Sequence, residues 1–132
     1  MKLRIQGNSI RLRLSRSEVH ALGSRGGLEE AVEFAPGQRL IYGLHASAEY
    51  EQIGVRFGGD RLIIQLPATE AEEWTENERA GLRGSVDLGG GRTLTLLVEK
   101  DYADLTEVER EEPKTEPWPE DDTLDRWDER SD

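Results

Sequence analysis

Cysteine is absent from the 132-residue chain, aromatic residues make up only 6% of it, and apolar residues 35%. The lack of cysteine excludes disulfides, thiolate metal sites and cysteine nucleophiles, and it favours a reducing compartment, so we expect a cytoplasmic protein. No apolar run approaches the roughly 18 residues that a membrane span needs, and the N-terminus lacks the apolar core of a signal peptide. We therefore expect no contact with a membrane.

Histidine is also scarce, since only His20 and His45 occur. Neither has neighbours at the spacing of a metal site or of a catalytic triad. The glycine runs lie between predicted strands and do not open helices, so they do not indicate a phosphate loop. The sequence thus predicts no catalytic residue, no metal and no cofactor, and it favours binding over catalysis. A small enzyme with a cleft between two halves is the weaker alternative, and it would need His20 or His45 in a pocket with an acidic partner.

The formal charge of -11 is unevenly distributed along the chain. Residues 1–98 hold twelve basic and thirteen acidic side chains, whereas residues 99–132 hold five basic and fifteen acidic ones. The last segment also contains Pro113, Pro117 and Pro119 and few apolar residues, a composition that cannot offset the entropy of ordering. We expect one globular domain over residues 1–99 and a disordered acidic tail over 100–132.

Local patterns predict alternating hairpins and helices. Residues 3–14 alternate apolar and polar positions on both sides of Gly7-Asn8-Ser9, which predicts two strands around a turn. Ser15 and Glu18 have the spacing of a capping box, which predicts the start of a short helix. Two further strands are expected at 28–34 and 39–46.

The same order recurs in the second part of the chain. Strands are expected at 53–57, 62–66, 84–88 and 93–99. Between them, a helix is expected to start near Pro67, with Thr69 and Glu72 as a second possible capping box. Residues 2–46 and 53–99 therefore form two pseudo-repeats of strand, strand, helix, strand, strand.

Matching residues support an internal duplication. Offsets of 52 and 54 residues align nine identities over thirty-seven positions, including Gly7 with Gly59 and Leu40 with Leu94. The predicted fold is mainly β (α+β), a small barrel or paired sheets from two duplicated ββαββ halves with two short helices. The alternative is a plain meander whose hairpins look alike because all tight hairpins need turn glycines.

The first half resembles the AbrB/MazE swapped-hairpin family of bacterial regulators and antitoxins. The matching residues are Gly7, Asn8, Ser9, Ile10, Arg13 and Leu14, while Ser15 stands in place of the family's proline and Gln6 in place of its aromatic residue. The whole chain also resembles an uncharacterised family of short bacterial proteins. The first resemblance implies a DNA-binding dimer whose two copies complete one barrel. A duplicated chain would then be a monomeric pseudo-dimer.

Basic residues gather near the N-terminus and form the first candidate site. The candidates for contact with nucleic acid or with an acidic partner are Lys2, Arg4, Asn8, Arg11, Arg13 and Arg16. Arg11 and Arg13 share one face of a strand by its period of two. The plainer explanation is that outward-facing strand positions are charged to stay solvated. In the second half, Ile63 and Gln65 stand at the positions equivalent to Arg11 and Arg13. This argues against DNA binding in which both halves contribute equally.

Large apolar residues in the acidic tail form the second candidate site. These residues are Trp118, Leu124 and Trp127. A tryptophan among acidic residues can anchor a segment on a partner while the carboxylates steer it to a basic surface. The alternative is a solubilising tail that docks on its own domain. We therefore expect a non-enzymatic, AbrB/MazE-like regulatory protein with a protein partner, nucleic acid being the second candidate. A protein-interaction module that does not bind nucleic acid is the alternative.

Overall fold

A computed structural model describes residues 1–102 of the chain. Residues Met1–Asp101 form one compact unit. The elements are β1 (Lys2–Gln6), β2 (Ser9–Leu14), α1 (Arg16–Arg25), β3 (Gly27–Ala35), β4 (Gln38–Ser47), β5 (Gly54–Gly58), β6 (Arg61–Pro67), α2 (Ala68–Glu76), β7 (Gly81–Gly89) and β8 (Arg92–Lys100). The sequence predicts a tail from residue 100, but Lys100 is the last residue of β8 because its strand pairing continues to that position. Residues 103–132, with Trp118, Leu124 and Trp127, lie outside the described residues.

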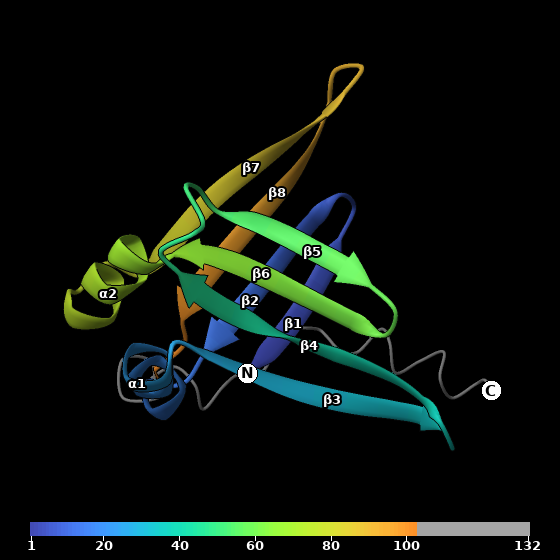
Figure 1. Cartoon of the computed structure of the whole chain (residues 1–132), viewed down its shortest axis with the longest axis horizontal. Helices are drawn as coiled ribbons and strands as arrows, with labels where there is room; N and C mark the ends of the chain where they lie inside the picture. Colours follow the sequence, from blue (N-terminus) through green and yellow to red (C-terminus); the bar gives the residue numbers. More distant parts are fainter. Residues whose placement is uncertain (103–132) are drawn as a thin grey trace, which may run out of the picture. The chain divides into compact units, whose positions relative to one another are not determined.

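The eight strands form two mixed sheets (Figure 1). Sheet A has the order β1-β2-β8-β7, and sheet B has the order β3-β4-β6-β5. Each half of the chain contributes one hairpin to each sheet, and parallel pairing of β2 with β8 and of β4 with β6 joins the halves. The two halves are thus interlocked and do not form separate domains.

Strand register repeats between the halves. The offsets of 52 and 54 residues carry each pairing of the first half onto a pairing of the second. In the first hairpins of the two halves, the pair Lys2–Arg13 corresponds to the pair Gly54–Gln65. In the parallel ladders, Ser9–Thr95 corresponds to Arg61–Ile41. In the second hairpins, Gly27–His45 corresponds to Gly81–Glu99. The register shift in β3 between Glu33 and Ala35 also recurs in β7 between Asp87 and Gly89. The prediction of paired sheets from two ββαββ halves is confirmed.

The alternative of a barrel is wrong. β1 and β7 are the edges of sheet A, β3 and β5 are the edges of sheet B, and no ladder joins the two sheets within residues 1–102. The inner strands are already paired on both sides, so closure would need pairing between edge strands. The bulges on β3 and β7 twist those edges, and this discourages further pairing.

The core lies between the sheets and under the two helices. Its fully buried side chains include Leu12, Leu14, Leu22, Leu44, Ile64, Leu66, Trp74, Leu82, Leu96 and Val98. Trp74 of α2 is a fully buried core residue. The Lys100 Nζ lies 5.0 Å from the centre of its ring, which adds a cation–π contact.

The two helices start differently. At α1 the Glu18 amide donates to the Ser15 hydroxyl, and the Ser15 amide donates to the Glu18 carboxylate, so the predicted capping box is present. The second capping box is wrong, because α2 begins at Ala68 and Thr69 already lies inside its first turn. Its N-cap is Pro67, which makes no side-chain cap. Among the described residues no helix has the length and apolarity to cross a membrane.

Candidate functional site: the outer face of sheet A

Five basic side chains lie together on the outer face of sheet A. Lys2 pairs with Arg13 and Arg4 pairs with Arg11 across the β1–β2 hairpin. In the next two strands Arg11 lies beside Leu97 of β8, and Leu97 pairs with Arg83 of β7. Period-two alternation turns these side chains outward, because the intervening Leu12, Leu82 and Val98 are buried in the core. We call this set the basic face: Lys2, Arg4, Arg11, Arg13 and Arg83.

Two carboxylates at the end of β8 lie within the basic face. Glu99 Oε1 is 3.5 Å from Arg11 Nε and 3.6 Å from Arg13 Nε. Asp101 is 3.2 Å from Lys2 Nζ and 3.6 Å from an Arg13 nitrogen. Glu99 and Asp101 thus contact three of the five cations, namely Lys2, Arg11 and Arg13.

The equivalent face of sheet B has a different composition. Gly54 pairs with Gln65 where sheet A has Lys2 with Arg13, and Arg56 pairs with Ile63 where sheet A has Arg4 with Arg11. Glu29 stands at the position of sheet B that is equivalent to Arg83. Arg61 Nη1 donates to both carboxylate oxygens of Glu29, at 2.8 and 2.7 Å. Ile63 is only 3% exposed. Within residues 1–102, cross-strand pairs of basic residues are thus a property of sheet A alone.

Asn8 and Arg16 lie outside the strands that carry the basic face. Asn8 is in the β1–β2 turn, where its side-chain amide donates to the Thr93 carbonyl at 2.8 Å and its own carbonyl accepts from the Thr95 amide at 3.0 Å. This pairing gives Asn8 a structural role in fixing the turn to β8. Arg16 is the exposed first residue of α1.

Arg83 is a member of the basic face that was not predicted from the sequence. Arg83 alternates with the apolar residues of its strand, a signal that indicates an outward side chain. Nothing in the local pattern, however, shows that β7 and β1 belong to the same sheet. The contribution of Glu99 and Asp101 was missed for the same reason.

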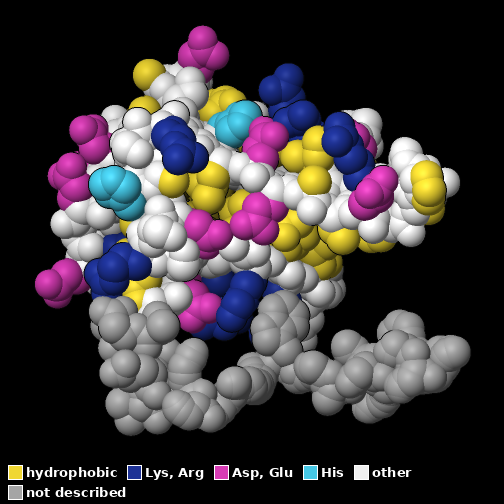
Figure 2. All heavy atoms as spheres, turned by 90° about the horizontal axis from the view of Figure 1, so that it is seen from below, with side chains coloured by type: hydrophobic (Ala, Val, Ile, Leu, Met, Phe, Trp, Pro, Cys, Tyr) yellow, Lys and Arg dark blue, Asp and Glu magenta, His cyan; other side chains and the backbone are white. Residues whose placement is uncertain are grey.

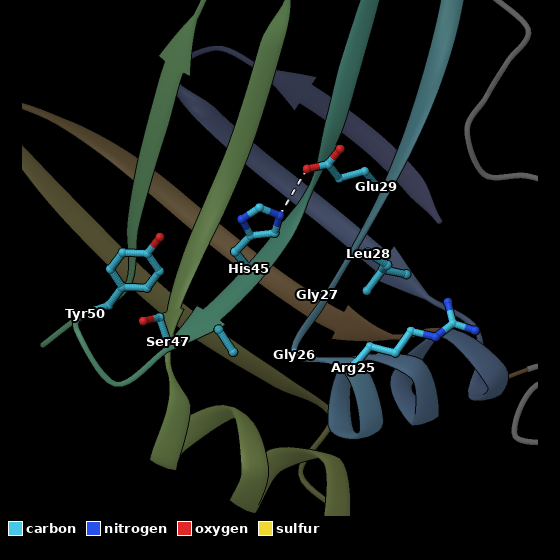
Figure 3. Close-up of a pocket in the computed structure, with 9 residues that line it drawn as sticks. Arg25, Gly26, Gly27, Leu28, Glu29, His45, Ser47 and Tyr50 are labelled. Carbon is cyan, nitrogen blue, oxygen red and sulfur yellow. Dashed lines mark hydrogen bonds and ion pairs between the residues drawn. The ribbon is translucent and has the colours of Figure 1, made fainter.

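A second candidate site is an open pocket of about 510 Å3 on the outer side of sheet B (Figure 3). Its floor includes the backbone of Gly26 and Gly27, and its walls include His45, Ser47 and Tyr50. A Cβ at Gly27 would lie 2.8 Å from the His45 ring and from the Leu44 carbonyl, so glycine is required for this close approach.

His45 points toward Glu29 in this pocket, with Nε2 at 3.0 Å from a carboxylate oxygen (Figure 3). His45 therefore has the pocket and the acidic partner that the enzyme alternative requires, whereas His20 is exposed on α1. The pocket is lined by residues 25–29, 45–47 and 50, however, so it is not the expected cleft between the two halves. Glu29 is also held by Arg61, and Ser47 Oγ accepts from the Glu49 amide. In residues 1–102 no group of three or more His, Cys, Asp or Glu is placed to hold a metal ion.

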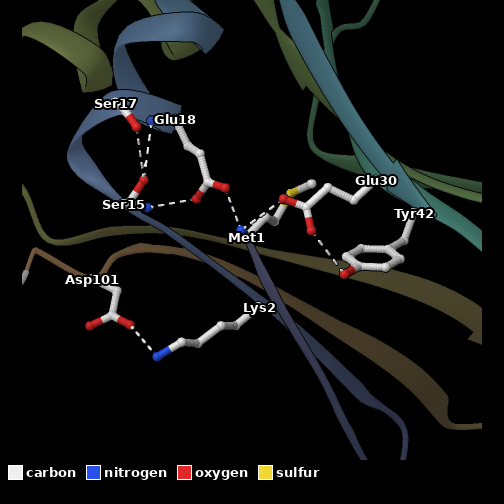
Figure 4. Close-up of polar contacts among 8 residues, drawn as sticks. All are labelled: Met1, Lys2, Ser15, Ser17, Glu18, Glu30, Tyr42 and Asp101. Atoms are coloured by element: carbon white, nitrogen blue, oxygen red, sulfur yellow. Dashed lines mark hydrogen bonds and ion pairs between the residues drawn. The ribbon is translucent and has the colours of Figure 1, made fainter. Parts of the chain in front are cut away.

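The N-terminal ammonium lies between two carboxylates, those of Glu18 in α1 and Glu30 in β3 (Figure 4). It contacts the Glu18 carboxylate and lies 3.0 Å from Glu30, which also accepts a hydrogen bond from the Tyr42 hydroxyl at 3.1 Å. Burial opposes the charge of the ammonium, but these carboxylates raise its pKa. Burial likewise opposes ionisation of Glu18, while the ammonium and the Ser15 hydrogen bonds lower the pKa of its carboxyl. Burial and Glu30 raise the pKa of Tyr42.

Comparison with known proteins places the chain in a family. Searches of curated proteins and of solved structures find no match. The expectation of an uncharacterised family is confirmed, whereas the bacterial origin and the AbrB/MazE resemblance stay predictions. The model of the Family of unknown function (DUF7009) matches residues 1–120, so the chain belongs to this family.

Proposed function

We propose that this protein is a non-enzymatic binding protein whose basic face takes an acidic segment of a protein partner. The observation that carries the proposal is the difference between the outer faces of sheets A and B. Both faces have the same strand order and register, so both have the same need for solvated outer positions and protected edges. Solvation and edge protection alone would give the two outer faces similar amino-acid compositions. Among the described residues, however, only sheet A has cross-strand pairs of basic residues.

Geometry favours a peptide over duplex DNA. Paired cations on β1 and β2 lie roughly 5 Å apart. The long Lys and Arg side chains can span the about 6.7 Å between alternate side chains of an extended segment. Arginine guanidinium groups bind carboxylates through two parallel hydrogen bonds. A DNA duplex presents one phosphate charge about every 1.7 Å along its axis. A protein that contacts many of these phosphates would need cations on both halves of the pseudo-dimer. Sheet B offers Ile63 and Gln65 instead.

DNA binding of the AbrB/MazE kind is the second form of this proposal. The strands that the resemblance assigns to DNA are β1 and β2, and they carry four of the five cations of the basic face. The acidic tail with Trp118 and Trp127 would then engage a different partner. Steep salt dependence would mark phosphate contacts.

A binding assay separates the two forms. Fluorescent oligoglutamate and a short DNA duplex would be titrated with the full chain and with a chain ending at Tyr102, at low and physiological salt. We expect Arg11→Gln with Arg13→Gln to weaken peptide binding at least about tenfold, since each hydrogen bond to a charged group contributes about 1.5–3 kcal/mol. Arg56→Gln with Arg92→Gln removes the same charge elsewhere and serves as the control. Equal losses in both double variants would contradict a specific site, and duplex binding without peptide binding would favour the AbrB-like role.

An enzyme is the second candidate function, and the His45–Glu29 pair in its pocket is the observation that favours it. A histidine held by a carboxylate can act as a general acid or base. Screening generic ester, phosphate and glycoside substrates would test this candidate. An activity lost in His45→Gln and kept in His20→Gln would support it.

A further inference from the structure

The open pocket beside His45 continues across the outer side of sheet B. A second open hollow, of about 710 Å3, adjoins it, and Tyr50 lines both. The second hollow follows Gly54 and Gln65 of sheet B and reaches Ser85 of β7. We call the two hollows together the sheet B groove, which is lined by His45, Tyr50, Gly54 and Gln65 among others.

One row of paired residues across the four strands explains why the sheet B groove is open. In sheet B the row is Gly27, His45, Gln65 and Gly54. The equivalent row of sheet A is Gly81, Glu99, Arg13 and Lys2. Sheet A thus carries three long charged side chains where sheet B carries two shorter side chains and a glycine. The shorter side chains leave room for a ligand on the outer side of sheet B.

Tyr50 is held at the groove by the turn that follows β4. The Tyr50 amide donates to the Ser47 carbonyl at 3.2 Å, and the Glu49 amide donates to the Ser47 hydroxyl at 3.1 Å. Figure 3 shows Tyr50 and Ser47 on the side of His45 that faces away from Glu29. The aromatic ring therefore stands where the two hollows meet, and the turn fixes it there before any ligand binds.

The groove offers hydrogen-bond donors and acceptors together. The Gln65 amide and the Tyr50 hydroxyl can each donate and accept, and neither has a hydrogen-bond partner among residues 1–102. Gln65 Oε1 lies 3.5 Å from the place of a Cβ on Gly54, so the amide lies along that glycine. The His45 and Glu29 side chains are 46% and 28% exposed, and Figure 2 shows a histidine beside an acidic side chain at the surface. The hydroxyls of a ligand, which also donate and accept, would match these groups.

The charges that line the groove disfavour other ligand classes. Its carboxylates are Glu29, Glu49, Glu51 and Asp87. Among the described residues that line it, Arg25 is the only lysine or arginine, so an anion would meet mostly like charges. Glu29 is already paired with Arg61, and exposed ion pairs contribute little, so the remaining carboxylates do not select a cation. An apolar ligand would leave the amide and hydroxyl groups unpaired.

We propose that the sheet B groove binds a neutral saccharide. A sugar ring packs its C–H face against the ring of Tyr50, whose face carries a partial negative charge. The Gln65 amide, lying along Gly54, hydrogen-bonds to the hydroxyls of the sugar. Volumes of about 510 and 710 Å3 are in the range of small-molecule sites. The proposal goes beyond the proposed function, because the basic face lies on sheet A, and it requires no catalysis by His45.

NMR titration of the isotope-labelled full chain tests the proposal. The probes are cellopentaose, maltopentaose and xylopentaose, each up to about 10 mM, so that dissociation constants in the millimolar range are detected. We expect at least one probe to shift the Gln65 side-chain amide and the backbone amides of Tyr50 and Gly54. These shifts should follow one saturation curve, because the residues line one groove.

Two variants alter the groove in different ways. Tyr50→Ala removes the aromatic ring, and Gly54→Lys introduces the side chain that sheet A has at the equivalent position. We expect each to raise the dissociation constant at least about tenfold, as for the loss of a central contact. The strand should tolerate Gly54→Lys, because a Cβ there makes only ordinary contact. Gln38→Ala, at the exposed start of β4, is the control, and the dispersion of each spectrum shows whether the variant is folded.

Three outcomes would overturn the proposal. The first is that none of the three oligosaccharides shifts these signals. The second is an oligosaccharide that binds Tyr50→Ala and Gly54→Lys as tightly as the unaltered chain. The third is that spermidine shifts the same signals at a lower concentration than any oligosaccharide, because the carboxylates would then make the groove a site for cations.

Discussion

Gly43 of β4 lies between Glu29 of β3 and Ile63 of β6, at a place where no side chain fits. A Cβ at this position would lie 2.2 Å from the Leu28 carbonyl oxygen and 2.9 Å from the Glu29 Cα, both backbone atoms that cannot move independently. The close approach of β3 lets Glu29 reach Arg61 and His45 over the outer side of sheet B. Gly43 thus supports both the ion pairs and the pocket.

Replacing Gly43 by alanine should therefore destabilise the fold. We expect Gly43→Ala to lower the free energy of unfolding by about 2 kcal/mol or more, in the range of overpacked positions. Gly58→Ala is the matched control, because it also lies in sheet B and a Cβ there would meet nothing within 4 Å. Urea unfolding of both variants measures the difference. Equal midpoints would show that β3 can move away from β4 at little cost.

At the level of single residues, the period of two in a strand correctly predicted on which face of the sheet a side chain lies. Alternation placed Arg11 and Arg13 on one outer face, and the structure has them there. The same rule failed for Ile63, which occupies an outward position yet is almost fully buried. The Arg61–Glu29 ion pair on that face joins residues 32 positions apart, so no local pattern could indicate it.

At the scale of elements, the cluster around the N-terminal ammonium links β1 to α1 and β3. The pKa of Glu18 is lowered, so its contribution to stability is present above the ordinary value of 4.5 and is lost as pH falls through the folded-state pKa. The pKa of the ammonium is raised, so its contribution is present below the ordinary value of 8.0 and is lost as pH rises through the folded-state pKa. The ion pair should therefore stabilise the fold most between these two values.

Glu18→Gln tests this window, because glutamine keeps the capping geometry and removes only the charge. We expect a loss of at most about 1 kcal/mol between pH 4.5 and 8.0, since the pair is partly solvated. The loss should shrink at lower and at higher pH. Glu70→Gln is the control, because Glu70 holds the equivalent place in α2 without a side-chain cap. Thermal unfolding across pH gives the comparison, and a loss that does not vary with pH would contradict the ion pair.

Helix starts show what local sequence can and cannot decide. The Ser15 capping box was predicted and is present, because a serine and a glutamate three residues apart satisfy each other's amides locally. Thr69 and Glu72 have the same spacing, yet α2 begins before them. Pro67 belongs to β6 and is paired with Ser47, so the sheet fixes where the chain turns into the helix. Tertiary pairing overrides the local signal here.

At the scale of the whole molecule, the first and last hairpins lie side by side in sheet A. The parallel pairing of β2 with β8 joins residues near position 10 to residues near position 96. The sequence could show two similar halves, but the choice between a barrel, paired sheets and a meander depends on long-range pairing. The repeat located the hairpins correctly, whereas their assembly came only from the structure. This assembly leads the C-terminal end of β8 directly to the basic face.

The acidic C-terminal segment should compete for the basic face. Residues 103–132 hold thirteen acidic and four basic side chains, and the chain enters this segment just after Asp101, which is paired with Lys2 and Arg13. A tethered segment acts at a high effective concentration, so it can exclude a partner with similar charge. Deleting residues 103–132 should raise the affinity for oligoglutamate about tenfold at low salt, and the gain should vanish above about 0.1 M salt, where charges are screened beyond about 10 Å.

Fluorescence anisotropy of labelled oligoglutamate, with both chain lengths, measures this competition. The control is the same deletion combined with Arg11→Gln and Arg13→Gln. In this variant the tail and oligoglutamate no longer share a binding site. Deletion of residues 103–132 should therefore change the affinity for oligoglutamate little. Equal affinities of the long and short chains at low salt would mean that the tail does not reach the face. The charge of -11 would then act on the whole molecule as a general repulsion of acidic partners, and the five cations of sheet A would have to overcome it for any acidic segment to bind.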